Sequence, residues 1–159
     1  MYATKDKGIA LTFLQKWDDF LIDQSIIDGR HILTERLPNI FEEIYKGKGG
    51  FLYYLNSTNF LEGQTSFTLE VVSEHREKVL RCEAIDDCYA KLCEMEQTGE
   101  IVLNRYPNRP AHMPLDNSDL IKRTKRFMQN SQDKNRLVGY VIQVHPNLKE
   151  ALSALLENH

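Results

Sequence analysis

The chain has 159 residues, of which 42% are hydrophobic and 27% charged, and its formal net charge is −3. This composition is ordinary for a globular protein with one hydrophobic core, and it excludes intrinsic disorder. No run of about 18 uncharged apolar residues exists, which excludes a transmembrane helix. The N-terminal residues also lack the uninterrupted apolar region of a signal peptide. We therefore expect one globular domain over residues 1–159, located in the cytoplasm.

The first third of the chain predicts two helices. Apolar residues recur at steps of three and four over residues 8–24, which predicts an amphipathic helix that ends at the Asp28-Gly29 pair. A second helix is predicted over residues 37–46, because Gly47 suits the position just past a helix end.

The middle of the chain predicts three strands and a helix. Residues 51–55 form an aromatic run typical of a strand, and apolar and polar residues alternate over residues 65–73. A further strand over residues 78–83 follows a short polar stretch, so we expect an antiparallel hairpin of the second and third strands. Steps of three and four over residues 84–97 then predict a helix.

The next segment predicts a strand over residues 100–103 and an extended, irregular stretch over residues 104–114. Three prolines lie in that stretch, and proline restricts both its own backbone and that of the residue before it. Polar residues at 116–118 are suited to cap a helix that runs to about Gln129.

The last segment predicts a strand and a helix. Residues 137–144 are apolar on both faces, which predicts a central strand, and the last helix begins at His145-Pro146-Asn147. The element order is then α-α-β-β-β-α-β-α-β-α. We expect an α+β fold in which a mixed, largely antiparallel sheet of about five strands packs with about five helices.

The sequence contains no catalytic motif. The glycine-rich residues 47–50 follow a helix and precede a strand, whereas a phosphate-binding loop runs from a strand into a helix. Adjacent carboxylates, as at Asp18-Asp19 and Asp86-Asp87, point about 100° apart on a helix and do not converge as an acid and a base. We therefore name no catalytic residue.

The three cysteines, Cys82, Cys88 and Cys93, indicate reduced thiols. An odd number without a signal peptide disfavours a disulfide framework, and their spacing differs from the paired C-x2-C of structural zinc sites. Cys88 also lies on the apolar stripe of its predicted helix, where cysteine usually acts as a small buried hydrophobe. We expect neither a metal site nor a cofactor.

Positive charge is concentrated in residues 105–136. This segment has eight basic and three acidic residues, whereas residues 1–104 have 11 basic and 18 acidic residues. Such asymmetry favours an anionic partner. The residues predicted to contact the anion are Arg105, Tyr106, Arg109, His112, Lys122, Arg123, Lys125, Arg126, Lys134 and Arg136.

Three functions remain open at this point. The first is a non-catalytic binding or regulatory domain that engages nucleic acid or another polyanion through residues 105–136. The second is a small protein-recognition domain, such as an inhibitor, an adaptor or an immunity-type protein, whose basic strip meets an acidic protein partner. The third is a small enzyme with a site in the 104–114 loop, where His112 acts as the general base while Arg105 and Arg109 hold an anion.

Overall fold

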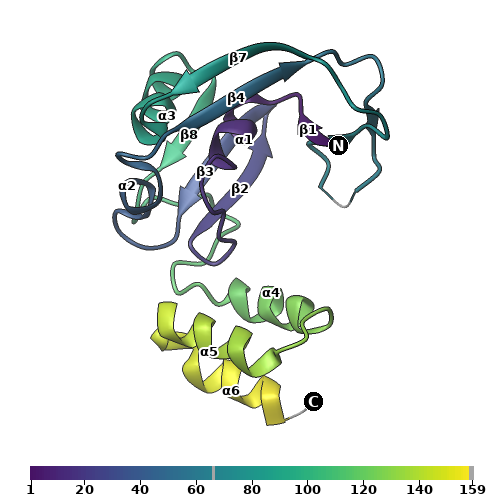
Figure 1. Cartoon of the computed structure of the whole chain (residues 1–159). Helices are drawn as coiled ribbons and strands as arrows, with labels where there is room; N and C mark the ends of the chain where they lie inside the picture. Colours follow the sequence, from purple (N-terminus) through teal and green to yellow (C-terminus); the bar gives the residue numbers. More distant parts are fainter. Residues whose placement is uncertain (66, 158–159) are drawn as a thin grey trace. The chain divides into compact units, whose positions relative to one another are not determined.

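The computed structural model describes residues 1–65 and 67–157 and has both helices and small sheets (Figure 1). The helices are α1 (Lys7–Thr12), α2 (Ile40–Tyr45), α3 (Cys88–Gln97), α4 (Asp119–Met128), α5 (Lys134–Val144) and α6 (Lys149–Glu157), with a 3-10 helix, η1 (Pro146–Leu148), before α6. The strands are β1 (Tyr2–Thr4), β2 (Ile22–Ile27), β3 (Arg30–Glu35), β4 (Gly50–Leu55), β5 (Leu61–Glu62), β6 (Glu70–Val72), β7 (Val79–Ile85) and β8 (Ile101–Asn104).

The predicted α+β class is confirmed, but the single five-stranded sheet is wrong. The described strands form three small sheets, ordered β1-β6-β5, β2-β3-β8 and β4-β7. The predicted hairpin of residues 65–73 with 78–83 is also wrong, because β6 pairs with β1 and β5 whereas β7 pairs with β4. Ser66, within the first of those predicted strands, lies outside the described residues.

The predicted helix over residues 8–24 is wrong beyond its first turns. α1 ends at Thr12, and the chain enters β2 at Ile22. Between them Asp18 forms a turn: its Oδ1 accepts the Phe20 N–H at 2.8 Å, and its backbone carbonyl accepts the Ile22 N–H at 3.0 Å. An aspartate that bonds its own neighbouring backbone competes with a helix, so the three-to-four-residue spacing does not continue as one.

Asp28 and Gly29 connect two strands where the sequence pattern predicted the end of a helix. Both residues have positive φ values, 50° and 75°, which is the backbone of a two-residue hairpin turn and favours the Asp-Gly pair. β2 and β3 are therefore antiparallel neighbours. Their pairing continues past the strand ends, where the Arg36 N–H donates to the Leu21 carbonyl at 2.9 Å.

The predicted central strand over residues 137–144 is also wrong, because these residues form most of α5. Asp133 caps the helix and accepts the Arg136 N–H at 2.9 Å, and Val138 and Val141 are buried three residues apart. A short apolar run does not distinguish a buried helix from a buried strand by periodicity alone. Here the helix is apolar on several sides because it packs with both α4 and α6.

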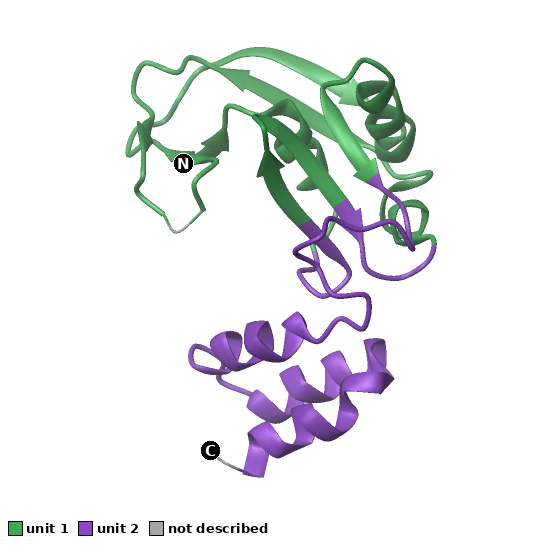
Figure 2. Cartoon of the chain, turned by 180° about the vertical axis from the view of Figure 1, so that it is seen from behind, with its two compact units in different colours: residues 1–17, 24–33, 39–103 green, residues 18–23, 34–38, 104–159 purple. Residues whose placement is uncertain are grey.

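The chain divides into two compact units (Figure 2). Unit 1 comprises residues 1–17, 24–33 and 39–103, and unit 2 comprises residues 18–23, 34–38 and 104–159. That the whole chain forms one domain stays a prediction. None of the described helices has the length and apolar character that crossing a lipid bilayer requires.

Unit 2 is built around α4, α5 and α6, with one aromatic side chain inserted from the N-terminal part of the chain. The buried core residues are Phe20, Leu120, Met128, Val138, Val141, Leu148 and Leu152. Phe20 meets the rings of Phe127 and Tyr140 edge to face, at centroid distances of 5.7 and 6.1 Å. This geometry is favourable for aromatic pairs and fixes residues 18–23 to the helices.

Candidate functional site

α4 separates its apolar and basic residues onto opposite faces. Leu120, Thr124 and Met128 recur every four residues and are buried in unit 2. The Thr124 hydroxyl donates to the Leu120 carbonyl at 2.7 Å, so this buried hydroxyl has a hydrogen-bond partner. Lys122 and Lys125 are exposed on the other side. Of the four basic residues predicted to face solvent on this helix, Lys122, Lys125 and Arg126 are exposed.

The exposed basic residues of α4 are followed closely along the chain by those of α5. A loop of five residues, 129–133, joins the two helices. We define the basic surface as the exposed basic side chains Lys122, Lys125, Arg126, Lys134 and Arg136. None of the five makes a salt bridge to any residue that the structure describes. The Arg126 guanidinium lies 5.4 Å from the centre of the Phe127 ring.

Arg123 does not join the basic surface, although it lies between its members in the sequence. Its guanidinium donates to the Asp19 carbonyl at 2.7 Å and to the Asp23 carboxylate. These partners belong to the N-terminal segment that carries Phe20. Arg123 therefore ties that segment to α4, and its positive charge is paired with an acidic residue of unit 2.

Arg109 is also engaged within unit 2. It donates to the Pro114 carbonyl at 2.6 Å, to Asn117 Oδ1 at 2.7 Å and to the Arg36 carbonyl at 2.5 Å. Burial lowers the pKa of its guanidinium, and the nearby Arg36 charge lowers it further. Three of its five N–H donors are thus used to hold the 104–114 segment.

The other predicted residues of the 104–114 segment are less enclosed. Tyr106 is partly exposed and its ring centre lies 5.7 Å from the Arg109 guanidinium, while its N–H donates to Glu35 Oε1 at 2.9 Å. The Tyr106–Pro107 peptide bond is cis. Arg105 is half-buried and His112 is exposed. A catalytic group of His112, Arg105 and Arg109 stays a prediction, and Arg109 already has internal hydrogen-bond partners.

A buried network of ion pairs and hydrogen bonds surrounds Arg36 at the start of α4, and the sequence did not predict it. Arg36 is 1% exposed and donates to both carboxylate oxygens of Asp119, at 3.0 and 2.8 Å. It also donates to Asp23 at 3.1 Å and to Asn117 at 3.3 Å. A guanidinium matches a carboxylate through two parallel bonds, which fixes the start of α4 relative to residues 34–38. No local pattern in the sequence signals this pairing, because the partners lie 83 residues apart.

His145 extends the network and is held in its neutral form. The ring is buried, with Nε2 2.7 Å from the Phe20 carbonyl and Nδ1 3.3 Å from the Asn117 amide nitrogen. These partners require Nε2 to donate and Nδ1 to accept, which is the arrangement of one neutral tautomer. Burial lowers the pKa of His145, and the Arg36 and Arg109 charges lower it further.

The network changes the charge that unit 2 presents. Its three segments together have ten basic and nine acidic residues, a formal charge of +1, because residues 18–23 contribute three aspartates. Arg36 and Arg123 are paired with acidic residues inside the unit. The excess positive charge predicted for residues 105–136 therefore remains only where side chains are exposed, on the basic surface.

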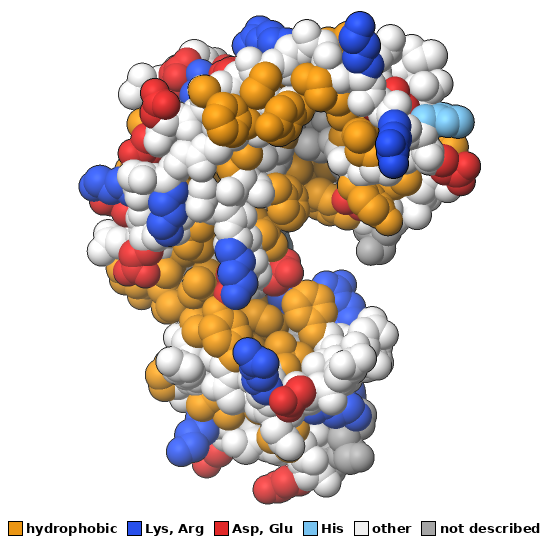
Figure 3. All heavy atoms as spheres, viewed as in Figure 1, with side chains coloured by type: hydrophobic (Ala, Val, Ile, Leu, Met, Phe, Trp, Pro, Cys, Tyr) orange, Lys and Arg blue, Asp and Glu red, His pale blue; other side chains and the backbone are white. Residues whose placement is uncertain are grey.

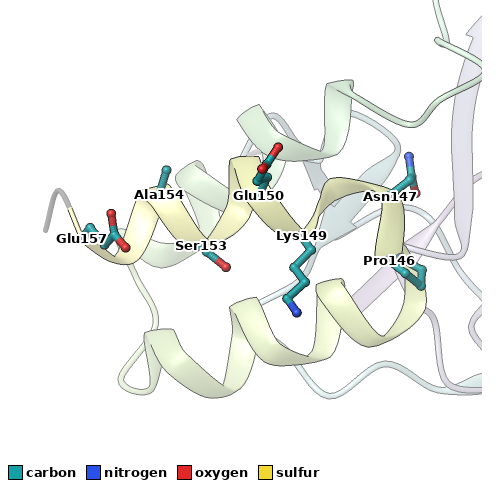
Figure 4. Close-up of a pocket in the computed structure, with 7 residues that line it drawn as sticks. All are labelled: Pro146, Asn147, Lys149, Glu150, Ser153, Ala154 and Glu157. Carbon is teal, nitrogen blue, oxygen red and sulfur yellow. The ribbon is translucent and has the colours of Figure 1, made fainter.

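Unit 2 also has a shallow depression along α6 (Figure 4). Its lining residues are Pro146, Asn147, Lys149, Glu150, Ser153, Ala154 and Glu157. Lys149 and Ser153 project to one side of the helix, whereas Glu150 and Ala154 project to the other. These side chains do not converge on a common point, so the depression offers no ligand site with directed polar groups.

Among the described residues, no group of three or more histidine, cysteine and acidic side chains lies close enough to hold a metal ion. None of the three cysteines forms a disulfide with a residue that the structure describes, and Cys88 is buried in the inner face of α3, as its place in the helical pattern predicted.

Comparison of the sequence with protein-family models gives no match, and neither curated proteins nor solved structures match the chain.

Proposed function

We propose that the basic surface binds a polyanion, and that this polyanion is nucleic acid. One observation carries the proposal: five basic side chains of α4 and α5 are exposed and have no salt-bridge partner among the described residues. Two other arginines of the same segment, Arg109 and Arg123, are held by internal partners. The chain thus pairs some of its positive charges and leaves this set available for phosphates.

The spacing of the three α4 residues suits a phosphate backbone. Lys122 and Lys125 are three residues apart, and Lys122 and Arg126 are four apart, so their side chains lie on one helix face about 5–6 Å apart at Cβ. Arginine binds a phosphate through two parallel bonds, and lysine binds it as a point charge. Contacts of this kind position a protein on nucleic acid without reading base sequence, so we expect binding that is independent of sequence.

Salt dependence provides the test. If all five side chains contact phosphates, the logarithm of the association constant falls with the logarithm of salt concentration with a slope of about −4.5 for duplex DNA and about −3.5 for a single strand. Fluorescence anisotropy with labelled 20-mers of duplex DNA and single-stranded RNA, measured between low and physiological salt, gives this slope.

Charge reversal at the basic surface tests whether these side chains bind the nucleic acid, as opposed to positive charge elsewhere on the protein. The Lys122→Glu/Arg126→Glu variant is expected to lower the magnitude of the slope by about 2 and to abolish measurable binding at physiological salt. Lys149→Glu, an exposed lysine on α6, is the matched control and is expected to keep most of the affinity. Equal losses in both variants, or no binding by the wild type at low salt, contradict the proposal.

The protein-recognition alternative makes a different prediction for the same variants. A single protein that co-purifies stoichiometrically with the wild type, and is lost with Lys122→Glu/Arg126→Glu, identifies an acidic protein partner in place of nucleic acid. Nuclease treatment distinguishes the two, because it releases a partner bound through nucleic acid and leaves a direct protein contact intact.

A further inference from the structure

The β4–β7 ribbon of unit 1 has an apolar outer face. The two strands pair antiparallel, with Phe51 opposite Ala84 and Tyr53 opposite Cys82. Because side chains alternate between the faces of a strand, these four residues share one face. Phe51 is 57% exposed and Tyr53 61% exposed, and Cys82 and Ala84 are exposed as well.

A bulge adds one more apolar side chain to this face. The register shifts between Tyr54, which is opposite Arg81, and Leu55, which is opposite Val79, so Leu80 is the extra residue. Its side chain is 63% exposed. Figure 3 shows hydrophobic side chains gathered over β4 and β7. We define the ribbon face as Phe51, Tyr53, Leu80, Cys82 and Ala84.

The charged side chains of the ribbon gather on its opposite face, beside the buried Leu52 and Ile85. The opposite face carries the charged groups: the Glu83 carboxylate accepts bonds from Tyr54 at 2.6 Å, Arg81 at 2.9 Å and Lys7 at 3.1 Å. An antiparallel sheet with one wet side normally turns its polar residues to water and its apolar residues inward. An exposed apolar face of this kind marks an interaction surface.

The size of the ribbon face suits the centre of a modest interface. Its exposed aromatic and aliphatic side chains present roughly 400 Å² of apolar surface, which matches the largest patch of a typical monomer. A standard interface buries about 800 Å² per partner, of which the central part is apolar and the rim polar. The ribbon face therefore supplies about half of what each partner of a stable complex buries.

The charge of unit 1 disfavours two classes of partner. Unit 1 has ten basic and 14 acidic residues, a formal charge of −4, which repels nucleic acid and anionic lipid surfaces. The ribbon face itself carries no charged residue. A second copy of the same face fits this uncharged surface, because it is apolar at its centre and brings no charged side chain of its own into the contact.

The charges beside the ribbon also favour a self-association with the two ribbons antiparallel. Lys78 precedes β7 and Asp86 follows it, and both are exposed. A two-fold axis that lies above the ribbon face, parallel to the line that joins Tyr53 and Cys82, places Lys78 of one copy opposite the partner's Asp86. The same axis brings each Cys82 opposite the partner's Cys82.

We propose that this protein forms a symmetric homodimer through the ribbon face, with Cys82 beside the two-fold axis. The inference is independent of the polyanion proposal, because it concerns unit 1 and a different set of residues. Sedimentation velocity over a wide concentration range is expected to give a monomer–dimer equilibrium in the micromolar range. Tyr53→Glu and Leu80→Glu are each expected to weaken the dimer at least tenfold, because they bury a charge at its centre.

Leu115→Glu is the matched control, since Leu115 is an exposed leucine of unit 2 and lies outside the ribbon face. It is expected to leave the dimer unchanged. Circular dichroism spectra that match the wild type show that the glutamate variants remain folded.

A chemical cross-link tests the position of the axis separately. Packed sheets lie about 10 Å apart, so thiols that point toward each other across the axis fall within reach of a short bis-maleimide. Cross-linking is expected for the wild type and for Cys93→Ser, and is expected to disappear in Cys82→Ser. A protein that stays monomeric at all concentrations, or a dimer unaffected by both glutamate substitutions, overturns the proposal. So does wild-type binding to neutral lipid vesicles that Tyr53→Glu abolishes while the protein stays monomeric.

Discussion

Removing Arg36 is expected to destabilise unit 2 strongly, although the residue is far from the proposed binding surface. In Arg36→Met the apolar part of the side chain is retained and four hydrogen bonds to Asp119, Asp23 and Asn117 are lost. Breaking a buried ion pair by removing one partner costs about 3–5 kcal/mol. Asp119 is partly exposed and can recover water, which reduces its share of that cost. We therefore expect a loss of about 3 kcal/mol.

Urea unfolding followed by circular dichroism at 222 nm measures this loss, because α4, α5 and α6 supply much of the helical signal. A lower midpoint with an unchanged slope reports a change in stability and not in the extent of unfolding. Arg136→Met is the control: its side chain is exposed and makes no salt bridge with the described part of the chain, so the variant's free energy of unfolding should stay within about 0.5 kcal/mol of the wild type.

The double variant Arg36→Met/Asp119→Leu examines the cause of the loss. Removal of both charges leaves no unpaired carboxylate, so the double variant is expected to be more stable than the sum of the two single losses predicts. A loss below about 1 kcal/mol for Arg36→Met would refute the view that this network holds unit 2 together. Strict additivity of the two substitutions would refute the coupling between the two residues.

Three further predictions follow from single positions. Burial lowers the pKa of His145 in the folded state, so on acidification the unfolded state binds a proton first. The free energy of unfolding should therefore fall as pH decreases from about 6.5 toward the lower, folded-state pKa. In His145→Gln this part of the pH dependence of the urea midpoint should disappear. Gly29→Ala should lower the free energy of unfolding by about 1 kcal/mol, because the φ of Gly29 is positive. Gly139 lies in open space on α5, so Gly139→Ala should raise the free energy of unfolding by up to about 1 kcal/mol. Thermal melts measure both changes. Arg123→Met should lower the free energy of unfolding and leave the salt-dependence slope of nucleic-acid binding nearly unchanged. Lys125→Met should lower the magnitude of that slope by about 1 and leave the free energy of unfolding unchanged. Urea unfolding measures stability, and fluorescence anisotropy measures the slope.

The sequence predicted best where local chemistry decides the structure. The strand that became β4 was predicted from an aromatic run, and the helix that became α3 and the exposed lysines of α4 were predicted from helical spacing. It failed where spacing alone was ambiguous. An apolar run packed among helices was interpreted as a strand, and the Asp28-Gly29 pair was interpreted as a helix end although it forms a hairpin turn.

The candidate site was predictable only for its exposed members. Arg109 and Arg123 look like their basic neighbours in the sequence, but each is bound by groups that come from a distant part of the chain. Arg123 meets Asp23 across 100 residues. Periodicity reports which face of a helix is buried, and it carries no information about which long side chain finds a partner there. The buried Arg36 network was missed for the same reason.

The discontinuous course of the chain through unit 2 has a consequence for folding. The C-terminal helices alone, residues 104–157, lack the Phe20 ring and the Arg36 and Asp23 side chains that complete their interior. Contacts between residues so far apart in sequence raise the contact order and slow folding, because long loops must close before the contacts form. During synthesis the three helices cannot reach their final packing as an independent module. Residues 18–23 and 34–38 are made first and stay without these partners until the three helices emerge, so a fragment that lacks residues 1–103 should be loosely packed, with helices that lack a complete core.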